Sequence, residues 1–166
     1  MIRNIGRLNA LIFALENRKP IDIVCIGTPR IIGDSVGPLV GTMLSKHRYN
    51  HNLRIVGTLD NPLTSESYPK LDVRKGAFVV AIDAAVGKKY PYVDINLGEL
   101  SPAACMNKKL QPVGNLSILC FTGRDLNHLL GCGLQLPYTM AESVTAALHD
   151  ILQTSVDNHL SASAVL

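Results

Sequence analysis

The stretch AFVVAID, residues 77–83, gives the strongest indication of the fold. Its first six residues are all apolar, which is typical of a strand buried on both faces of a parallel sheet. A second stretch, IDIVCIG at residues 21–27, is mostly apolar and rich in branched side chains, so it predicts another strand. Both stretches therefore predict central strands of an α/β protein.

Further elements are predicted on either side of these two strands. Apolar residues at three- and four-residue spacing predict helices over residues 2–17, 35–47 and 138–152. Branched and aromatic residues predict strands over residues 53–59, 92–97 and 115–122. Residues 153–166 are small and polar, so we expect them to fray. This alternation predicts a three-layer α/β sandwich with a mostly parallel central sheet. We expect one domain over residues 1–166, with its core at 21–152.

Composition excludes several classes of protein. The chain has 166 residues, a formal net charge of +3, 5% aromatic residues and no Trp. Nucleic-acid binders usually combine a basic stripe with aromatic side chains, so we expect no nucleic-acid partner. No apolar run approaches the roughly 20 residues of a membrane span, and the N-terminal residues lack the pattern of a signal peptide, so we expect none. The four cysteines form no C-x-x-C pair. We therefore expect a cytoplasmic protein with reduced thiols, no membrane partner and no zinc site.

Two acidic residues occupy the positions where α/β proteins bind ligands, beyond the carboxyl ends of the strands. Asp34 follows the loop after the first strand, and Asp83 directly follows the apolar run 78–82. Asp34 alone could cap a helix, and Asp83 alone could form a turn. A carboxylate next to a buried strand is costly without a partner or a function. Together, the two acids predict one functional site.

Other polar residues lie close to these acids in the sequence. Arg30 could pair with either acid, and Ser35 lies at a predicted helix N-terminus that could stabilise an oxyanion. Asp60 follows the second strand, as a third acid or as part of a turn. The stretch GTPRIIGDS at residues 27–35 is not a phosphate loop, because five residues separate its glycines and Asp follows the second. We predict no cofactor.

Four blocks of sequence resemble the YyaC family of sporulation proteins, in the same order. They are IVCIGT with GDSVGPLVG (residues 23–28 and 33–41), GTLDNP (57–62), VAIDA with Gly87 (80–84), and SP through NKK and PVG (101–102, 107–109, 112–114). The wider relatives are the germination protease of spore formers and the hydrogenase-maturation endopeptidases. The resemblance implies a phosphorylase/hydrolase-like fold and catalytic roles for Asp34 and Asp83. It also implies that Asn107 and one of the two lysines Lys108 and Lys109 face these acids, and we assign this role to Lys108.

The chain departs from the family pattern near the predicted site. The pattern has Asp at the position of Pro29 and His at the position of Thr64. The nickel-binding relatives use a later His, yet no His occurs between Asn52 and Asn127. We therefore predict no metal ligands.

Three hypotheses for the function follow. The first is a sporulation-associated peptidase in which Asp34 and Asp83 hydrolyse a protein or peptide substrate, possibly a spore protein. In this hypothesis Arg30, Ser35, Asp60, Asn107 and Lys108 contact the substrate. The second is a catalytically degenerate binding protein, and the third is a metal-dependent maturation endopeptidase. The sequence does not define the oligomeric state, and a homo-oligomer is one of the alternatives.

Overall fold

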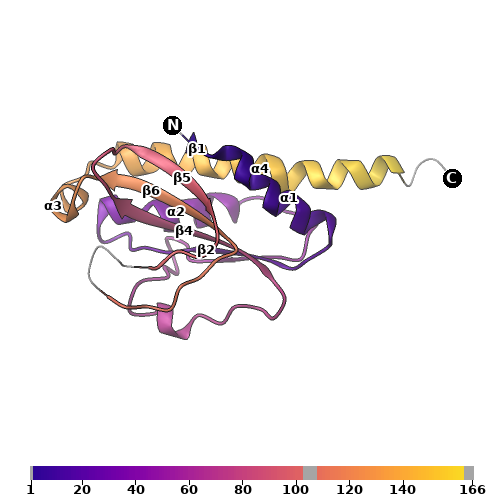
Figure 1. Cartoon of the computed structure of the whole chain (residues 1–166), viewed down its shortest axis with the longest axis horizontal. Coiled ribbons are helices and arrows are strands. Elements are labelled where there is room, and N and C mark those ends of the chain that lie inside the picture. Colours follow the sequence, from indigo (N-terminus) through magenta and orange to yellow (C-terminus); the bar gives the residue numbers. More distant parts are fainter. Residues whose placement is uncertain (1, 103–107, 163–166) are drawn as a thin grey trace.

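A computed structural model describes residues 2–102 and 108–162, with side chains described as far as residue 154. Its centre is a six-stranded sheet with the strand order β1-β5-β6-β4-β2-β3 (Figure 1). The strands are β1 (Ile2–Arg3), β2 (Ile21–Cys25), β3 (Leu53–Val56), β4 (Phe78–Val86), β5 (Tyr92–Leu97) and β6 (Leu116–Gly123). Only β5 and β6 pair in antiparallel fashion. The predicted mostly parallel α/β sheet is confirmed.

The two apolar runs form the middle of the sheet. β2 lies between β3 and β4, and β4 lies between β2 and β6. One detail of the prediction is wrong, because β4 does not end before Asp83. Residues 84–86 continue to pair with β6, so the strand carries Asp83 within it. Asp83 is therefore part of a strand, and the alternative of a turn-forming role is excluded.

Three helices pack against one face of the sheet: α1 (Asn9–Glu16), α2 (Val36–Leu44) and α4 (Gln135–Ala162). Their buried residues form one core with alternate residues of β2, β4, β5 and β6. Two glycines let α2 approach the sheet. A Cβ at Gly37 would lie 2.1 Å from the Ile26 carbonyl oxygen, and one at Gly41 would lie 1.9 Å from the Gly57 carbonyl oxygen. The backbone of α2 thus lies directly on that of its neighbours.

The third layer covers the opposite face and consists mainly of loops. Its buried residues come from the segments 57–76 and 98–113, and they pack on Val24, Val79 and Ala81. Within the described part of these segments, the one helical turn is the 3-10 helix η3 (Tyr68–Lys70). The helices therefore lie on one side of the sheet in Figure 1 and the loops on the other. Both predicted aspartates turn out to lie on the loop side or at the carboxyl edge.

Several element bounds differ from the prediction. Residues 2–17 form β1, the 3-10 helix η1 (Ile5–Leu8) and α1 instead of one helix. The closing helix, α4, is longer than predicted at both ends and includes residues expected to fray. The short helix α3 (Leu126–Leu130) was not predicted, and it packs against η2 (Ile32–Asp34) and β6. Among the described residues, no helix is long and apolar enough to cross a membrane.

Candidate functional site

Asp34 and Asp83 line one cavity of about 220 Å³, which lies beyond the carboxyl end of β2 and beside the carboxyl-terminal half of β4. The chain leaves β2 through a loop and reaches Asp34 at the end of η2. Gly27 allows the start of this loop to lie against Asp34, because its φ is +139° and a Cβ there would lie 2.1 Å from the Asp34 carbonyl oxygen. The structure therefore brings the two predicted acids to the same site from different strands.

Asp34 does not act as a helix cap. Its Oδ2 accepts a hydrogen bond of 2.9 Å from the backbone N–H of Thr28, across the loop. Ser35 is the N-cap residue of α2 and makes no side-chain capping bond. Burial raises the pKa of Asp34 to about 6, and the Thr28 hydrogen bond offsets part of this rise. Asp34 can thus gain or lose a proton close to neutral pH.

Asp83 is more deeply buried, with only 6% of its surface exposed. Its charge acts on a neighbour in the loop layer, Tyr68. Burial raises the pKa of Tyr68 to about 12, with further contributions from the charges of Asp83 and Glu99. The Tyr68 hydroxyl donates a hydrogen bond of 2.7 Å to the Gln111 carbonyl oxygen. A neutral tyrosine therefore borders the Asp83 side of the site.

A polar wall from the loop layer closes the other side of the cavity. It is formed by Thr64, Ser65 and Glu66, together with Lys108. The Lys108 Nζ donates a hydrogen bond of 2.8 Å to the Ser65 Oγ. Thr64 Oγ1 accepts a hydrogen bond of 3.3 Å from the Glu66 backbone N–H. The lysine therefore ties its own loop to segment 64–66 at the rim of the cavity.

The predicted substrate-contacting residues divide into two groups. Arg30 and Lys108 line the cavity with both acids, whereas Asn107 lies outside the described residues. Ser35 is not a lining residue, because its side chain is buried and its Oγ donates to the Ile32 carbonyl oxygen at 2.6 Å. Asp60 is also not among the lining residues, and it is exposed in a turn closed by the bond from Thr58 N–H to the Asn61 carbonyl oxygen.

Sequence reasoning missed Thr28, Ser65 and Glu66 as parts of the site. The segment 64–66 is polar and lies between the prolines at 62 and 69, so the sequence predicted an ordinary loop. Thr64 was singled out only as a departure from the family pattern, and it does line the cavity. Pro29, the other departure, is exposed and is not among the lining residues.

The described lining of the cavity lacks the ligands that nickel prefers. Among the described residues, it offers carboxylates and hydroxyls, together with the cations Arg30 and Lys108, but no imidazole or thiolate. Nickel prefers nitrogen and sulfur ligands, whereas carboxylates alone suit hard cations. Within the described residues, no group of three or more His, Cys, Asp or Glu side chains is arranged to hold a metal. We derive no step through a metal.

The fold and the cavity define an α/β protein with a pair of aspartates at the carboxyl edge of its sheet. The chain matches the family described as "Protein of unknown function (DUF1256)" over residues 4–147, and it belongs to that family. It is 39% identical over 107 residues to "Uncharacterized protein YyaC" of Bacillus subtilis (strain 168). This match confirms the resemblance to the YyaC family. It covers 60% of this chain and 52% of the relative, so the chain spans about half the length of that curated relative.

Among solved structures, the chain is similar to the [NiFe] hydrogenase maturation protease HycI from Thermococcus kodakarensis KOD1. The sequence identity is 20% and the TM-score is 0.49. The superposition covers 84% of this chain and 99% of the HycI chain.

Proposed function

We propose that this protein is a peptidase-like hydrolase that cleaves a protein substrate in the cytoplasm of sporulating cells. The observation that carries the proposal is the shared cavity of Asp34 and Asp83. The resemblance of the sequence blocks around these residues to the germination protease supports the same activity.

The chemistry needs a base and an acid. Peptide hydrolysis requires a water that attacks the carbonyl carbon and a proton for the departing amine. With its pKa raised to about 6, Asp34 is largely ionised at neutral pH and more basic than an exposed carboxylate. Asp34 would take a proton from the water as its oxygen bonds to the carbonyl carbon. In this proposal Asp83 carries the one proton of the pair. It would give that proton to the amine as the C–N bond breaks, and the proton on Asp34 would then pass to Asp83.

A peptide substrate has room on both sides of Asp83. A second cavity, of about 440 Å³, also includes Asp83 and Ala84 in its lining. It extends over the loop side of β6 and β5, past Ser117, Asn96 and Glu99. An extended chain could therefore cross the two acids and occupy both cavities. Arg30 and Lys108 would contact the part of the substrate that lies in the smaller cavity, together with Asn107.

The test is a cleavage assay with small acid-soluble spore proteins, analysed by mass spectrometry. We expect discrete fragments from the wild type and a loss of at least about 100-fold in Asp34→Asn and Asp83→Asn. The matched control is Asp60→Asn, because Asp60 is an exposed acid outside the cavity. Cleavage by the wild type should increase as the pH rises through about 6, as Asp34 ionises. Cleavage that persists in both cavity variants would remove these acids from the mechanism.

One observation favours a second candidate, a binding protein that does not cut. Thr64 lines the cavity at a position where the family pattern has His. A threonine cannot exchange a proton near neutral pH as an imidazole does. Binding without cleavage should survive Asp34→Asn and Asp83→Asn. Retained capture of a spore protein by an Asn variant, together with no fragments from the wild type, would favour this candidate.

A further inference from the structure

A cluster of exposed cations lies at the carboxyl edge of the sheet, at the end next to α3 in Figure 1. In the sequence two lysines are adjacent in the turn from β4 to β5, and the fold adds two arginines, one from β1 and one directly after β6. The basic edge, as we call this surface, consists of Arg3, Lys88, Lys89 and Arg124. All four residues are exposed to solvent.

Aromatic rings hold the two arginines in place. The guanidinium carbon of Arg3 lies 3.9 Å from the centre of the Tyr92 ring, and Tyr92 stacks on Phe121 with ring centroids 4.3 Å apart. Arg124 lies over the Tyr90 ring, at 5.7 Å from its centre. A guanidinium that lies on a ring keeps the N–H groups at its edge available for a carboxylate. The rings therefore preorganise both arginines for a carboxylate ligand.

The turn with the two lysines lies against the same aromatic stack. A Cβ at Gly87 would lie 2.8 Å from the Phe121 ring, so the backbone of the turn contacts that ring directly. The Gly87 N–H also donates a hydrogen bond of 2.8 Å to the carbonyl oxygen of Gly123, the residue before Arg124. These contacts place Lys88 and Lys89 beside the arginines.

The basic edge has an excess of positive charge. Two acids lie close to it, and each already accepts a hydrogen bond from a neutral donor. Asp94 Oδ1 accepts from Asn4 Nδ2 at 2.6 Å, and Asp125 Oδ1 accepts from the His128 backbone N–H at 2.9 Å. Within the part of the chain that the structure describes, none of the four cations forms an ion pair. An occupant with several negative charges is therefore attracted to this surface.

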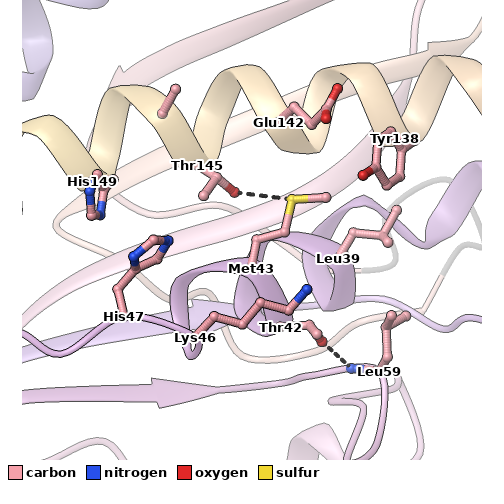
Figure 2. Close-up of a pocket in the computed structure, with 11 residues that line it drawn as sticks. Leu39, Thr42, Met43, Lys46, His47, Leu59, Tyr138, Glu142, Thr145 and His149 are labelled. Carbon is pink, nitrogen blue, oxygen red and sulfur yellow. Dashed lines mark hydrogen bonds between the residues drawn. The ribbon is translucent and has the colours of Figure 1, made fainter.

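The groove between α2 and α4 has no such excess (Figure 2). It has a volume of about 430 Å³ on the helical side of the sheet. With histidine neutral, its charged lining residues are Lys46 on α2 and Glu142 on α4. One positive charge against one negative charge gives no preference for an occupant of either sign. Of the two surfaces, the basic edge is the one that selects by charge.

The rings of the basic edge favour a polypeptide over a nucleic acid. Single-stranded nucleic acids bind by stacking their bases on open aromatic faces. The Tyr92 ring lies between Phe121 and the Arg3 guanidinium, so neither of its faces is open. Tyr90 already contacts the His128 ring, with centroids 4.4 Å apart. An acidic polypeptide needs only the charges and the N–H donors, which are available.

The basic edge borders the cavity of about 440 Å³ that includes Asp83, because Val86 and Phe121 belong to the lining of that cavity. Asp83 pairs with Leu119 on β6, and Arg124 follows five residues further along the chain. At about 3.3 Å per residue this separation is roughly 16 Å, which an extended peptide spans with about five residues. One substrate chain can therefore reach both Asp83 and the basic edge.

We propose that the basic edge binds an acidic segment of the protein substrate, about five residues from the peptide bond that lies at Asp83. Arg3 and Arg124 would bind carboxylates through paired hydrogen bonds, and Lys88 and Lys89 would add attraction. The position of the segment relative to the cleaved bond rests on the proposed hydrolase function. Binding of the segment itself does not require hydrolysis.

The test is fluorescence anisotropy with a labelled peptide of alternating Gly and Glu, of about 12 residues or roughly 40 Å when extended. The full chain is titrated into it at about 0.1 M salt, where the Debye length is about 10 Å. A matched peptide with Gln in place of Glu should bind at least about tenfold more weakly. Arg3→Lys keeps the charge but loses the planar donor group, and should weaken binding of the Glu peptide about threefold.

The main variant is Lys88→Glu/Lys89→Glu, which should bind the Glu peptide at least about tenfold more weakly than the wild type. Its matched control is Lys19→Glu/Lys75→Glu, which changes the net charge by the same amount. Lys19 and Lys75 are exposed and precede β2 and β4, so they lie at the opposite edge of the sheet. The control should bind like the wild type.

Equal weakening by the two double variants, or equal binding of the Glu and Gln peptides, would overturn the proposal. An oligothymidylate of about 12 nucleotides tests the other class of partner. Tighter binding of this oligonucleotide than of the Glu peptide, lost in Lys88→Glu/Lys89→Glu, would assign the surface to nucleic acid and also overturn the proposal.

Failure of this proposal and failure of the proposed hydrolysis can be distinguished. Anisotropy does not need cleavage, so an absence of fragments in the cleavage assay leaves the peptide-binding result in place. Loss of peptide binding leaves the cleavage result in place. In any fragments that form, we expect Asp and Glu to be enriched about five residues to one side of the cut. Fragments without this enrichment would overturn the proposed position of the acidic segment.

Discussion

Two aspartates of this chain show how hydrogen-bond donors decide the effect of burial. At Asp34 burial raises the pKa to about 6, and one backbone N–H opposes it. At Asp22 burial also acts to raise the pKa, but the Arg74 backbone N–H and the Arg54 and Arg74 side chains outweigh it and lower the pKa. Of the two carboxyl groups, Asp34 is thus the one that titrates near neutral pH.

The variant Asp34→Asn should be at least as stable as the wild type at pH 7.5. The pKa of Asp34 rises from 3.8 to about 6 on folding, so the folded state binds the proton more tightly. The wild type therefore loses stability as the pH rises from about 4 to above 6, at most about 3 kcal/mol. Asn cannot ionise and still accepts the Thr28 hydrogen bond. Urea unfolding at pH 4 and at pH 7.5 measures the free energy of unfolding of the variant and the wild type. A stability advantage of the variant that is equal at the two pH values would contradict this account.

The variant Asp22→Asn should be strongly destabilised. Asp22 is fully buried and accepts bonds from Arg54 at 2.5 Å and from the Arg74 Nε at 2.6 Å. Removing its charge leaves both guanidinium groups without an ionic partner, at a cost of about 3 kcal/mol. Because folding lowers its pKa, the wild type should lose this stabilisation as the pH falls below 3.8. Urea unfolding tests this, with the exposed Asp72→Asn as control. Equal stability of the two variants would contradict it.

At the scale of the elements, helix α2 packs against the sheet with very little space between the two backbones. It begins at Val36, two residues after Asp34. Its glycines allow its backbone to contact the residues that directly follow β2 and β3, which are Ile26 and Gly57. The position of Asp34 therefore depends on how closely α2 packs against the sheet.

The variant Gly41→Ala should be destabilised by about 3 kcal/mol. The added methyl group would lie 1.9 Å from the Gly57 carbonyl oxygen, so the helix or the loop must move. Thermal unfolding tests this, with Gly133→Ala as control because a Cβ there meets no atom within 4 Å. A melting temperature for Gly41→Ala that equals that of Gly133→Ala would show that α2 can move at little cost.

The elements also show which features of the fold and the site could be predicted from the sequence. The apolar runs around Val24 and Val80 predicted central strands because strands buried on both faces leave a continuous apolar pattern. The buried role of Asp22 was missed, since its partners come from Arg54 and Arg74, far along the chain. The sequence predicted Asp34 and Asp83 at one edge of a parallel sheet. The loop wall around Ser65 could not be predicted, because its sequence has no periodic pattern. Contacts between distant loops depend on the tertiary fold.

For the whole molecule, the buried cysteines report on global unfolding. Cys25 on β2 and Cys120 on β6 are fully buried on either side of β4, and burial raises the pKa of both thiols. Iodoacetamide reacts with the exposed thiolate, so both should react at least about 1000-fold more slowly in the native protein than in urea. Peptide mapping by mass spectrometry measures each thiol separately. Fast native labelling of Cys25 would indicate local opening beneath α2.

The place of β1 in the sheet has a consequence for how the protein is made. β1 contains residues 2–3, and its one neighbour is β5, at residues 92–97. On the ribosome, residues 2–3 must therefore wait for their strand partner until residues 92–97 have been synthesised. The α1 helix waits longer still for part of its packing surface, because α4 is translated after β5 and β6. Completion of the sheet and of its helical cover thus requires β5 and α4, while the pairing of β2 with β3 and β4 can begin earlier.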